Sequence, residues 1–403
     1  MKMQSYHRRT WAEIDLDALE NNYNAVRRTI SPSTKFCCVV KADGYGHGAV
    51  ELSRLYERLG ADWLAVSNVE EALQLREAGI KASILVLGYT PPEAAAFLAK
   101  YGIAQCVMSY EYGEALAKEA ESAGVDVKIH IKLDTGMGRI GFSCKAREDL
   151  GESVEAQERS IDEICTISKM RGLVPEGIFT HFSSADEGEE GDEYTAYQLE
   201  RFNFVVRELS ARGVEFELRH ASASSAILDH PEAELDMVRA GIVLYGISPS
   251  DSIRAKTSSL IPAMKLKTVV LQVKELLPGE YVSYGRTYQA DEKRTVATLP
   301  IGYADGFLRR NSKIGTELEI DGQRATLIGR VCMDQCVIDI TGIDGARVGD
   351  EVTVFGGIIT VEELARLNRT IPYEIFCGIS RRIPRIYLSG GKVVHVADYI
   401  LDL

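Results

Sequence analysis

The feature that most constrains the fold of this chain is a regular alternation of strand-like and helical segments over its first 245 residues. Short apolar runs recur there, and most of the intervals between them have the apolar spacing of an amphipathic helix. The runs fall near residues 36–41, 62–67, 83–88, 103–108, 126–133, 176–181, 216–221 and 236–245. Continuous apolar runs are typical of parallel strands that are covered on both faces. The pattern predicts a (β/α)8 barrel of the TIM type, with a doubly wound open sheet as the alternative, because alternation alone does not decide closure.

The sequence changes in character after Pro249, where strand-like runs are separated by Gly, Pro and Asp turns. We therefore expect a barrel over residues 12–245 and a β-rich C-terminal domain over 246–403, which residues 1–11 join. Within the barrel, residues 143–160 are rich in Glu, Ser and Lys, and we expect a solvated insertion there. The acidic, Gly-rich residues 186–193 predict an exposed loop.

Composition excludes several classes of partner. The net charge of −13 argues against nucleic acid or an anionic membrane surface, because both attract basic proteins. No apolar run has the length of a membrane span, and the polar, basic first eleven residues do not resemble a signal peptide. The eight scattered cysteines form no paired metal-binding arrangement, so we expect reduced thiols, no metal site and a cytoplasmic protein.

Lys41 stands at the carboxyl end of the first apolar run, directly before a glycine-studded turn that ends at Gly48. A neutral lysine amine forms a Schiff base with an aldehyde. Glycines let the backbone approach a ligand closely, and the helix that follows offers N–H groups to an anion such as a phosphate. A lone lysine here would be an ordinary exposed strand end. With Tyr45 and the glycines beside it, the turn instead predicts a site for an anionic cofactor.

Other strand ends also have polar or cationic residues, which are Lys132 to Arg139, His181, His220 to Ser225, and Arg239 to Gly241. Each has a structural interpretation: a satisfied histidine, a Ser-rich loop, a partly buried ion-pair arginine. In a barrel, however, the carboxyl ends of the strands form the active face. The convergence of these groups on that face therefore predicts an active site.

Together these residues resemble the alanine racemase family, whose members have a barrel and a C-terminal β domain and use pyridoxal 5'-phosphate. The likeness extends from Thr10 to Tyr387. It rests on the blocks Val40–Gly48, Lys132–Arg139, Met237–Gly241, Ser283–Gly285 and Cys332–Asp334.

The resemblance implies a two-base mechanism, since moving an α-proton between faces requires a base on each side of the substrate. Lys41 would hold the cofactor and act as one base, and Tyr284 of the partner subunit in a homodimer would be the other. Arg239 would sit on the pyridine nitrogen with His181 hydrogen-bonded behind it. An arginine keeps its own proton, so it disfavours the protonated ring and the side reactions that this form promotes.

The resemblance also assigns the remaining contacts. The phosphate would be held by Tyr45, Ser224 and the backbone amides of Gly241 and Ile242. Arg139 would face the cofactor's phenolic oxygen and the substrate carboxylate, oriented by Lys132, which is often carbamylated in relatives. The backbone of Met333 would contact substrate across the dimer interface.

The implied function is the interconversion of L- and D-alanine, which supplies D-alanine for peptidoglycan. Two positions depart from the family pattern: Arg381 replaces a tyrosine beside the substrate pocket, and Ala223 replaces an asparagine before the phosphate serine. A serine or broad-specificity racemase is therefore the first alternative. A decarboxylase of the same architecture is disfavoured by Arg239, and a non-catalytic cofactor-binding barrel by the presence of the second domain.

Overall fold

The computed structural model describes residues 8–145 and 151–401. The chain divides into two compact units. The barrel unit contains Glu20–Gly44 and Ala49–Ile261, and the β unit contains the chain up to Leu19, Tyr45–Gly48 and the chain from Pro262 onward. Among the residues described, no helix has the length and apolar character needed to cross a membrane.

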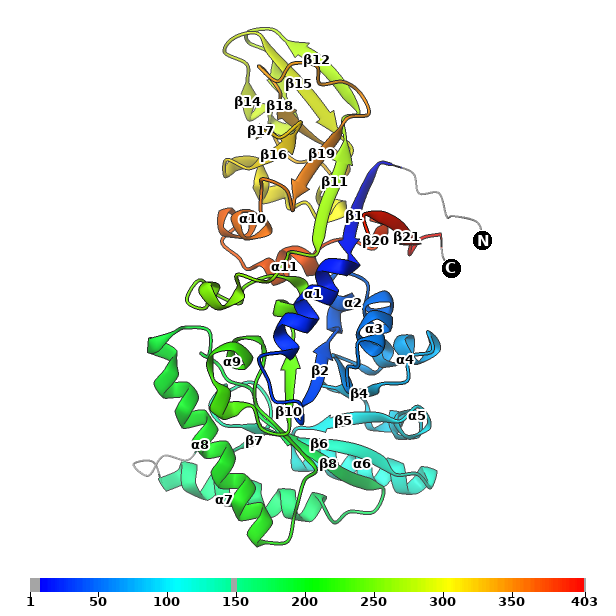
Figure 1. Ribbon diagram of the computed structural model, residues 1–403, viewed down its shortest axis with the longest axis vertical. Helices are drawn as coiled ribbons and strands as arrows, with labels where there is room; N and C mark the ends of the chain where they lie inside the picture. Colours follow the sequence, from blue (N-terminus) through cyan, green and yellow to red (C-terminus); the bar gives the residue numbers. More distant parts are fainter. Residues whose placement is uncertain (1–7, 146–150, 402–403) are drawn as a thin grey trace. The chain divides into compact units, whose positions relative to one another are not determined.

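The barrel unit is built on eight parallel strands whose order around the sheet is β10-β2-β3-β4-β5-β6-β8-β9 (Figure 1). They are β2 (Lys35–Val39), β3 (Trp63–Val66), β4 (Ser83–Val86), β5 (Ile103–Val107), β6 (Val127–Asp134), β8 (Leu173–Phe179), β9 (Leu218–His220) and β10 (Met237–Ala240). The short β7 (Phe142–Ser143) pairs with β6 outside this order. The sheet comes close to forming a closed barrel, because its two end strands, β10 and β9, are joined by hydrogen bonds. Arg239 N donates to Ser222 O, and Asp236 N donates to Arg219 O, both at 3.0 Å. The predicted barrel is confirmed, and the open doubly wound sheet is excluded.

Helices follow most of the barrel strands (Figure 1). They are α3 (Ala49–Arg58), α4 (Val69–Glu77), α5 (Ala95–Lys100), α6 (Tyr110–Ala123), α7 (Gly151–Ile167), α8 (Glu189–Ala211) and α9 (Ser224–Asp229). Helix α1 (Leu16–Arg27) precedes β2, and the segment labelled α2 (Lys41–Tyr45) is a left-handed turn. A 3-10 turn, η3 (Ile242–Tyr245), follows β10.

Two predicted irregular segments are helical over part of their length. Residues 151–160 belong to α7, so the expected insertion is wrong there, and residues 146–150 lie outside the described residues. The charged composition conceals buried positions at helical spacing, namely Gln157, Ser160, Ile161 and Ile164. The expected acidic loop gives way to α8 at Glu189, because carboxylates are favourable in the first turn of a helix.

The β unit contains a ten-stranded sheet of order β12-β15-β18-β17-β16-β19-β11-β1-β20-β21. Its strands are β1 (Thr10–Asp15), β11 (Met264–Val269), β12 (Gln272–Leu276), β15 (Arg294–Leu299), β16 (Glu317–Ile320), β17 (Gln323–Ile328), β18 (Cys336–Asp339), β19 (Glu351–Phe355), β20 (Arg385–Ser389) and β21 (Lys392–Ala397). A two-stranded ribbon, β13 (Tyr281–Val282) and β14 (Tyr288–Gln289), and two helices, α10 (Val361–Leu367) and α11 (Pro372–Cys377), complete the unit.

Strand β1 belongs to this sheet, although the expected boundary assigned residues from 12 onward to the barrel. Ala12 is in antiparallel register with Leu266 of β11 and in parallel register with Arg385 of β20. In the barrel, β2 already pairs with β10 on one edge and β3 on the other. No free edge therefore remains beside β2 for an additional strand.

Candidate active site

The barrel unit carries eight of the predicted site residues, all near the carboxyl ends of its strands. They are Lys41 after β2, Lys132 in β6, Arg139 after β6, His181 after β8, Ser224 at the start of α9, Arg239 in β10, and Gly241 and Ile242 after β10. Strand ends of a parallel barrel meet on one face, so residues distant in sequence share one site.

Four cationic side chains lie close enough to His181 for their charges to lower its pKa. Burial lowers the pKa of His181 well below its usual range, and the charges of four neighbours lower this pKa further. These neighbours are, in decreasing order of effect, Arg239, Lys132, Arg139 and Lys41. The structure therefore brings the predicted cationic residues together around one neutral imidazole. Such a concentration of positive charge suits an anionic ligand.

Arg239 is buried and held by the barrel wall. Its Nη1 donates to His220 Nδ1 at 2.7 Å, and its Nη2 donates to the carbonyl oxygens of Thr180 and Ala221, both at 2.8 Å. Burial lowers the pKa of Arg239 to about 10, which still leaves the guanidinium charged at neutral pH. The side chain is thus a fixed hydrogen-bond donor.

His220 is a site residue that sequence analysis placed only at the start of a polar stretch. The predicted contact of His181 with Arg239 is present but long, with His181 Nδ1 3.4 Å from Arg239 Nη2, and His220 makes the shorter contact of 2.7 Å. The alternating burial of β9, in which Arg219 is exposed and its two neighbours are buried, points His220 into the barrel. That alternation is a signal that the sequence offers.

A line of hydrogen-bonding groups continues from His220 through the barrel. His220 Nε2 lies 2.9 Å from His130 Nδ1, and His130 Nε2 lies 3.5 Å from Oε2 of Glu176, which pairs with Lys128. A guanidinium only donates, so His220 Nδ1 accepts and its proton is on Nε2. That proton is donated to His130 Nδ1, which leaves the His130 proton facing Glu176. Burial lowers the pKa of both imidazoles, so both are neutral.

Lys132 is a buried amine beneath the same face. Its Nζ donates to Leu133 O at 2.7 Å and lies 5.3 Å from the ring centroid of Phe179. Burial lowers the pKa of Lys132 to about 8, and the charge of Arg239 contributes to this change. Phe179 also lies 5.4 Å from the Arg239 guanidinium and stacks on His220 at 4.8 Å. The Phe179 ring therefore contacts Lys132, Arg239 and His220. The sequence analysis did not predict Phe179 as a site residue.

The loop that carries Arg139 is anchored by Asp134. The Asp134 carboxylate accepts hydrogen bonds from Gly136 N at 3.1 Å and Gly138 N at 2.9 Å, and Lys145 Nζ lies 3.2 Å from its second oxygen. Burial alone would raise the pKa of Asp134, but these contacts lower it below its usual value. The carboxylate therefore remains charged and holds the loop in place.

Gln198 of α8 joins this loop to the residues after β8. Its Nε2 lies 3.3 Å from Thr135 Oγ1 and donates to His181 O at 3.2 Å, while its Oε1 accepts from Ser183 N at 2.9 Å. The side chain is fully buried. Nothing in the helical pattern of α8 distinguishes this glutamine from a surface one, so the sequence did not reveal it.

Ser224 and Gly241 form a second cluster at the strand ends. Gly241 N donates to Ser224 Oγ at 3.0 Å, and Gly241 is the residue that precedes η3. Ala223, the N-cap of α9, provides no side-chain cap. Backbone N–H groups at the start of a helical turn are suited to a phosphate.

Lys41 begins an unusual turn. Ala42, Asp43, Gly44 and Tyr45 have φ values of 52°, 55°, 60° and 50°, so four successive residues are left-handed. For a non-glycine residue this conformation costs roughly 1–2 kcal/mol. Strain of this size persists only where surrounding contacts impose it, and it is concentrated at functional sites.

Tyr45 belongs to the β unit, where its ring lies 5.7 Å from that of Tyr373. Burial raises the pKa of Tyr45, so the hydroxyl keeps its proton and can donate a hydrogen bond.

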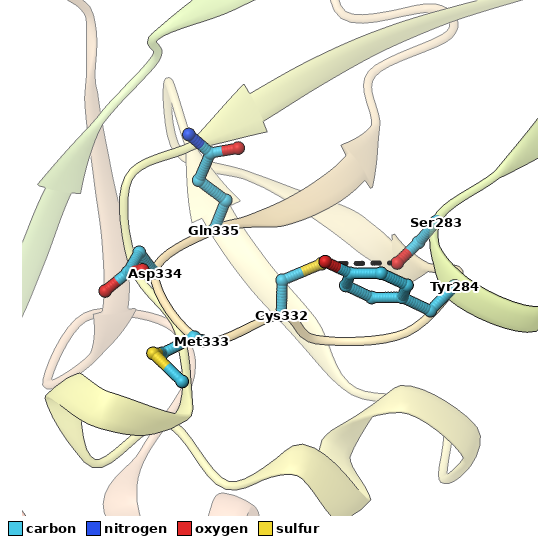
Figure 2. Close-up of a pocket in the computed structure, with 6 residues that line it drawn as sticks. All are labelled: Ser283, Tyr284, Cys332, Met333, Asp334 and Gln335. Carbon is cyan, nitrogen blue, oxygen red and sulfur yellow. Dashed lines mark hydrogen bonds between the residues drawn. The ribbon is translucent and has the colours of Figure 1, made fainter.

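Tyr284 and Met333 line a pocket of about 480 Å³ in the β unit. Figure 2 shows Tyr284 on one loop and Cys332 to Gln335 on another, joined by the contact of Ser283 Oγ with Cys332 Sγ at 3.4 Å. Tyr284 is 70% exposed and Met333 53% exposed. Ser283 and Arg286, which flank the tyrosine, have positive φ values of 63° and 49°. The loop therefore presents a large aromatic side chain outward on a strained backbone.

Family models match both parts of the chain: the alanine racemase N-terminal domain over residues 14–249 and the alanine racemase C-terminal domain over residues 263–387. Alanine racemase 1 of Clostridium acetobutylicum is 43% identical over 98% of this chain and 99% of its own length. A solved alanine racemase of Clostridium difficile superposes with a TM-score of 0.91 at 41% identity, covering 98% of this chain and 100% of that one. The alanine racemase of Bacillus anthracis with bound L-Ala-P gives a TM-score of 0.89 at 37% identity, covering 99% and 100%.

A barrel with a cationic strand-end site and a second, β-rich unit is the architecture that this chain shares with these solved racemases, which are isomerases. The comparisons then identify the family, because the two family models together match most of the chain and the relatives cover nearly all of it. The chain belongs to the alanine racemase family.

Proposed function

We propose that this protein interconverts L- and D-alanine with pyridoxal 5'-phosphate as cofactor. The observation that carries the proposal is the convergence of Lys41, Lys132, Arg139 and Arg239 around His181 at the strand ends. The relative solved with L-Ala-P supports a small amino acid as substrate.

The residues present fit this cofactor. An aldehyde requires an amine, which Lys41 supplies, and a phosphate requires N–H and hydroxyl groups, which Gly241, Ile242 and Ser224 supply. The cofactor's ring system, when bound, accepts the electron pair left at the substrate Cα. Arg239 would donate to the ring nitrogen while keeping its own proton, since its pKa remains about 10. Arg139 would pair with the substrate carboxylate.

Two bases would exchange the α-proton. Lys41 would serve one face of the substrate, and Tyr284 of the partner subunit would serve the other. The 70% exposure of Tyr284 supports this assignment, because a second subunit would bury the ring and remove it from water. Met333, in the same pocket, would provide its backbone to the partner's site. The active form would therefore be a homodimer with shared sites.

Lys132 would be carbamylated. Its pKa of about 8 leaves about a fifth of the amine neutral near pH 7.4, and only the neutral amine reacts with carbon dioxide. The carbamate would place a negative charge beside Arg139 and hold that guanidinium toward the substrate.

The cellular role would be the supply of D-alanine for peptidoglycan in the cytoplasm. All eight cysteines are free thiols, in keeping with a reducing compartment.

A serine or broad-range racemase is the second candidate. Arg381 is exposed and its guanidinium lies 5.6 Å from the ring centroid of Tyr399, and Ala223 makes no side-chain cap. Both positions differ from the family pattern near the substrate and the phosphate.

The deciding experiment is parallel racemisation of L-alanine and L-serine with added pyridoxal phosphate, with the D-isomer measured by chiral chromatography and Lys41→Ala as the control. We expect turnover of alanine well above serine and none in the variant. Equal or greater turnover of serine would transfer the assignment to the second candidate. A yellow protein that turns over neither amino acid would contradict both the alanine racemase and the serine or broad-range racemase assignments.

A further inference from the structure

The left-handed turn after Lys41 is held by a carboxylate that belongs to a different βα unit. Glu71, in the first turn of α4, accepts a hydrogen bond from Ala42 N on Oε1 and from Ser67 N on Oε2, both at 2.7 Å. We call this arrangement the Glu71 clamp. Both bonds join a charged acceptor to a backbone donor, which is the stronger kind of hydrogen bond.

The clamp acts where the sheet no longer restrains the chain. Strands β2 and β3 are in register up to Val39 and Ala65, and the last ladder bond beyond that pair runs from Val40 N to Ala65 O at 2.9 Å. After Val40 the backbone enters the left-handed turn and diverges from β3. The Glu71 carboxylate then joins the two strand ends, bonding the residue directly after Lys41.

Glu71 itself is fixed in position. Its backbone N–H donates to Asn68 Oδ1 at 2.9 Å, the N-cap bond of α4. The far side of the turn is held separately, because Asp43 Oδ1 accepts from Ala49 N at 2.9 Å. The turn is therefore restrained at both ends by carboxylates, and the Glu71 clamp bonds the residue directly after Lys41. A backbone bond from Gly44 N to Val40 O at 2.8 Å closes the turn itself.

We infer that Glu71 is a positioning residue for Lys41, which acts through the backbone of Ala42 and keeps the lysine amine at the strand end. The inference rests on the proposed function, in which Lys41 holds the cofactor and transfers a proton.

The test compares three variants of Glu71 in the full-length protein. Glu71→Gln keeps the shape but has one acceptor oxygen, so one clamp bond is lost. Glu71→Asp keeps the charge but shortens the reach. Glu71→Ala removes the clamp altogether. Exposed Glu70, in the same helical turn, gives matched controls in Glu70→Gln and Glu70→Ala, which change the charge near the α4 N-terminus without changing the clamp.

Two measurements accompany the racemase assay: hydrogen exchange of peptides covering residues 40–48 and 64–70, and cofactor affinity from the yellow absorbance. We expect faster exchange in both peptides, weaker cofactor binding and a kcat lowered about tenfold or more in all three Glu71 variants, with KM changing less. The Glu70 variants should match the wild type. Because Glu71→Gln and Glu71→Asp are conservative, they decide the matter if Glu71→Ala does not fold.

Exchange and cofactor affinity in the Glu71 variants equal to those in the Glu70 variants would overturn the inference. A Glu71→Asp variant that matches the wild type in these measurements would also overturn the inference. A carboxylate on a shorter side chain would then be sufficient, so the two bonds that Glu71 makes would not be needed. If the wild type racemises neither amino acid, the proposed function fails, but the exchange comparison still decides whether the clamp holds the turn.

Discussion

The Arg239 guanidinium donates to His220 Nδ1 at 2.7 Å, and this contact determines where the protons lie in the barrel core. His220 must carry its proton on Nε2, which faces His130 at 2.9 Å. Both imidazoles are neutral because burial lowers their pKa values. The arginine proposed for the cofactor's ring nitrogen is thus held by a neutral, correctly oriented acceptor.

The neutral His220 predicts a specific sensitivity to acid. Its folded pKa lies well below the usual 6.5, so below about pH 6.5 the unfolded chain binds a proton that the folded chain does not. The free energy of unfolding should then fall by about 1.4 kcal/mol per pH unit for this group as pH decreases. His220→Gln retains an acceptor for Arg239 and removes the titrating group, so its stability should decline less steeply.

Urea unfolding at several pH values between about 4.5 and 6.5 measures this slope. His395→Gln, at an exposed position, is the control for replacing a histidine with glutamine. Parallel curves for the wild type and His220→Gln would contradict the neutral, buried imidazole.

Shared active sites predict complementation between two inactive variants. Lys41→Ala lacks one proposed base, and Tyr284→Phe lacks the other. In a mixed dimer, one site would combine Lys41 of the second chain with Tyr284 of the first, so it would have both bases. We expect each homodimer to be inactive and the mixture, after dissociation and reassociation, to recover activity.

Differently tagged chains allow the mixed dimer to be purified and assayed. Recovery should not exceed one working site per dimer. If the purified mixed dimer is as inactive as the parents, the two bases do not come from different subunits.

The depressed pKa of Lys132 predicts pH-dependent carbamylation. With a pKa of about 8, the neutral fraction of the amine decreases about tenfold for each pH unit below that value. Isotope-labelled bicarbonate should therefore give a carbamate signal in carbon NMR spectra near pH 8 that is nearly lost near pH 6. Lys132→Met is the control, and a signal that persists in this variant would assign the carbamate to another amine.

The barrel could be predicted from sequence because each parallel strand is covered on both faces and is therefore a continuous apolar run. The same reasoning located Lys41 and Arg239, since strand ends are visible as boundaries of those runs. It did not locate the partner of β1, because the pairing of Ala12 with Leu266 joins residues far apart in sequence.

The contacts between side chains were less predictable. Whether His181 or His220 lies nearer to Arg239 depends on the spacing of β8 and β9 around the ring, which no local pattern contains. Gln198 and Glu71 are ordinary polar residues on amphipathic helices. Their importance arises only when the fold brings them to the backbone of another βα unit.

Arg381 predicts a difference in substrate preference from relatives that have a tyrosine at this position. Its guanidinium lies 5.6 Å from the ring centroid of Tyr399, so the side chain is drawn toward the C-terminal segment. A tyrosine narrows the substrate pocket in the family pattern, and an arginine held by Tyr399 would leave room for a hydroxyl-bearing substrate. We expect Arg381→Tyr to lower the ratio of serine to alanine turnover, measured as kcat/KM for each substrate.

The change in the ratio of serine to alanine kcat/KM should correspond to about 1–3 kcal/mol of differential transition-state binding, as is usual for a small change in pocket size. Arg366→Tyr, on α10, controls for the general effect of replacing an arginine in the β unit. Tyr399→Leu should also lower the ratio of serine to alanine turnover, by less than Arg381→Tyr, because the released arginine is free to enter the space that Tyr399 keeps it out of. A ratio unaffected by Arg381→Tyr would show that this position does not set the preference between alanine and serine.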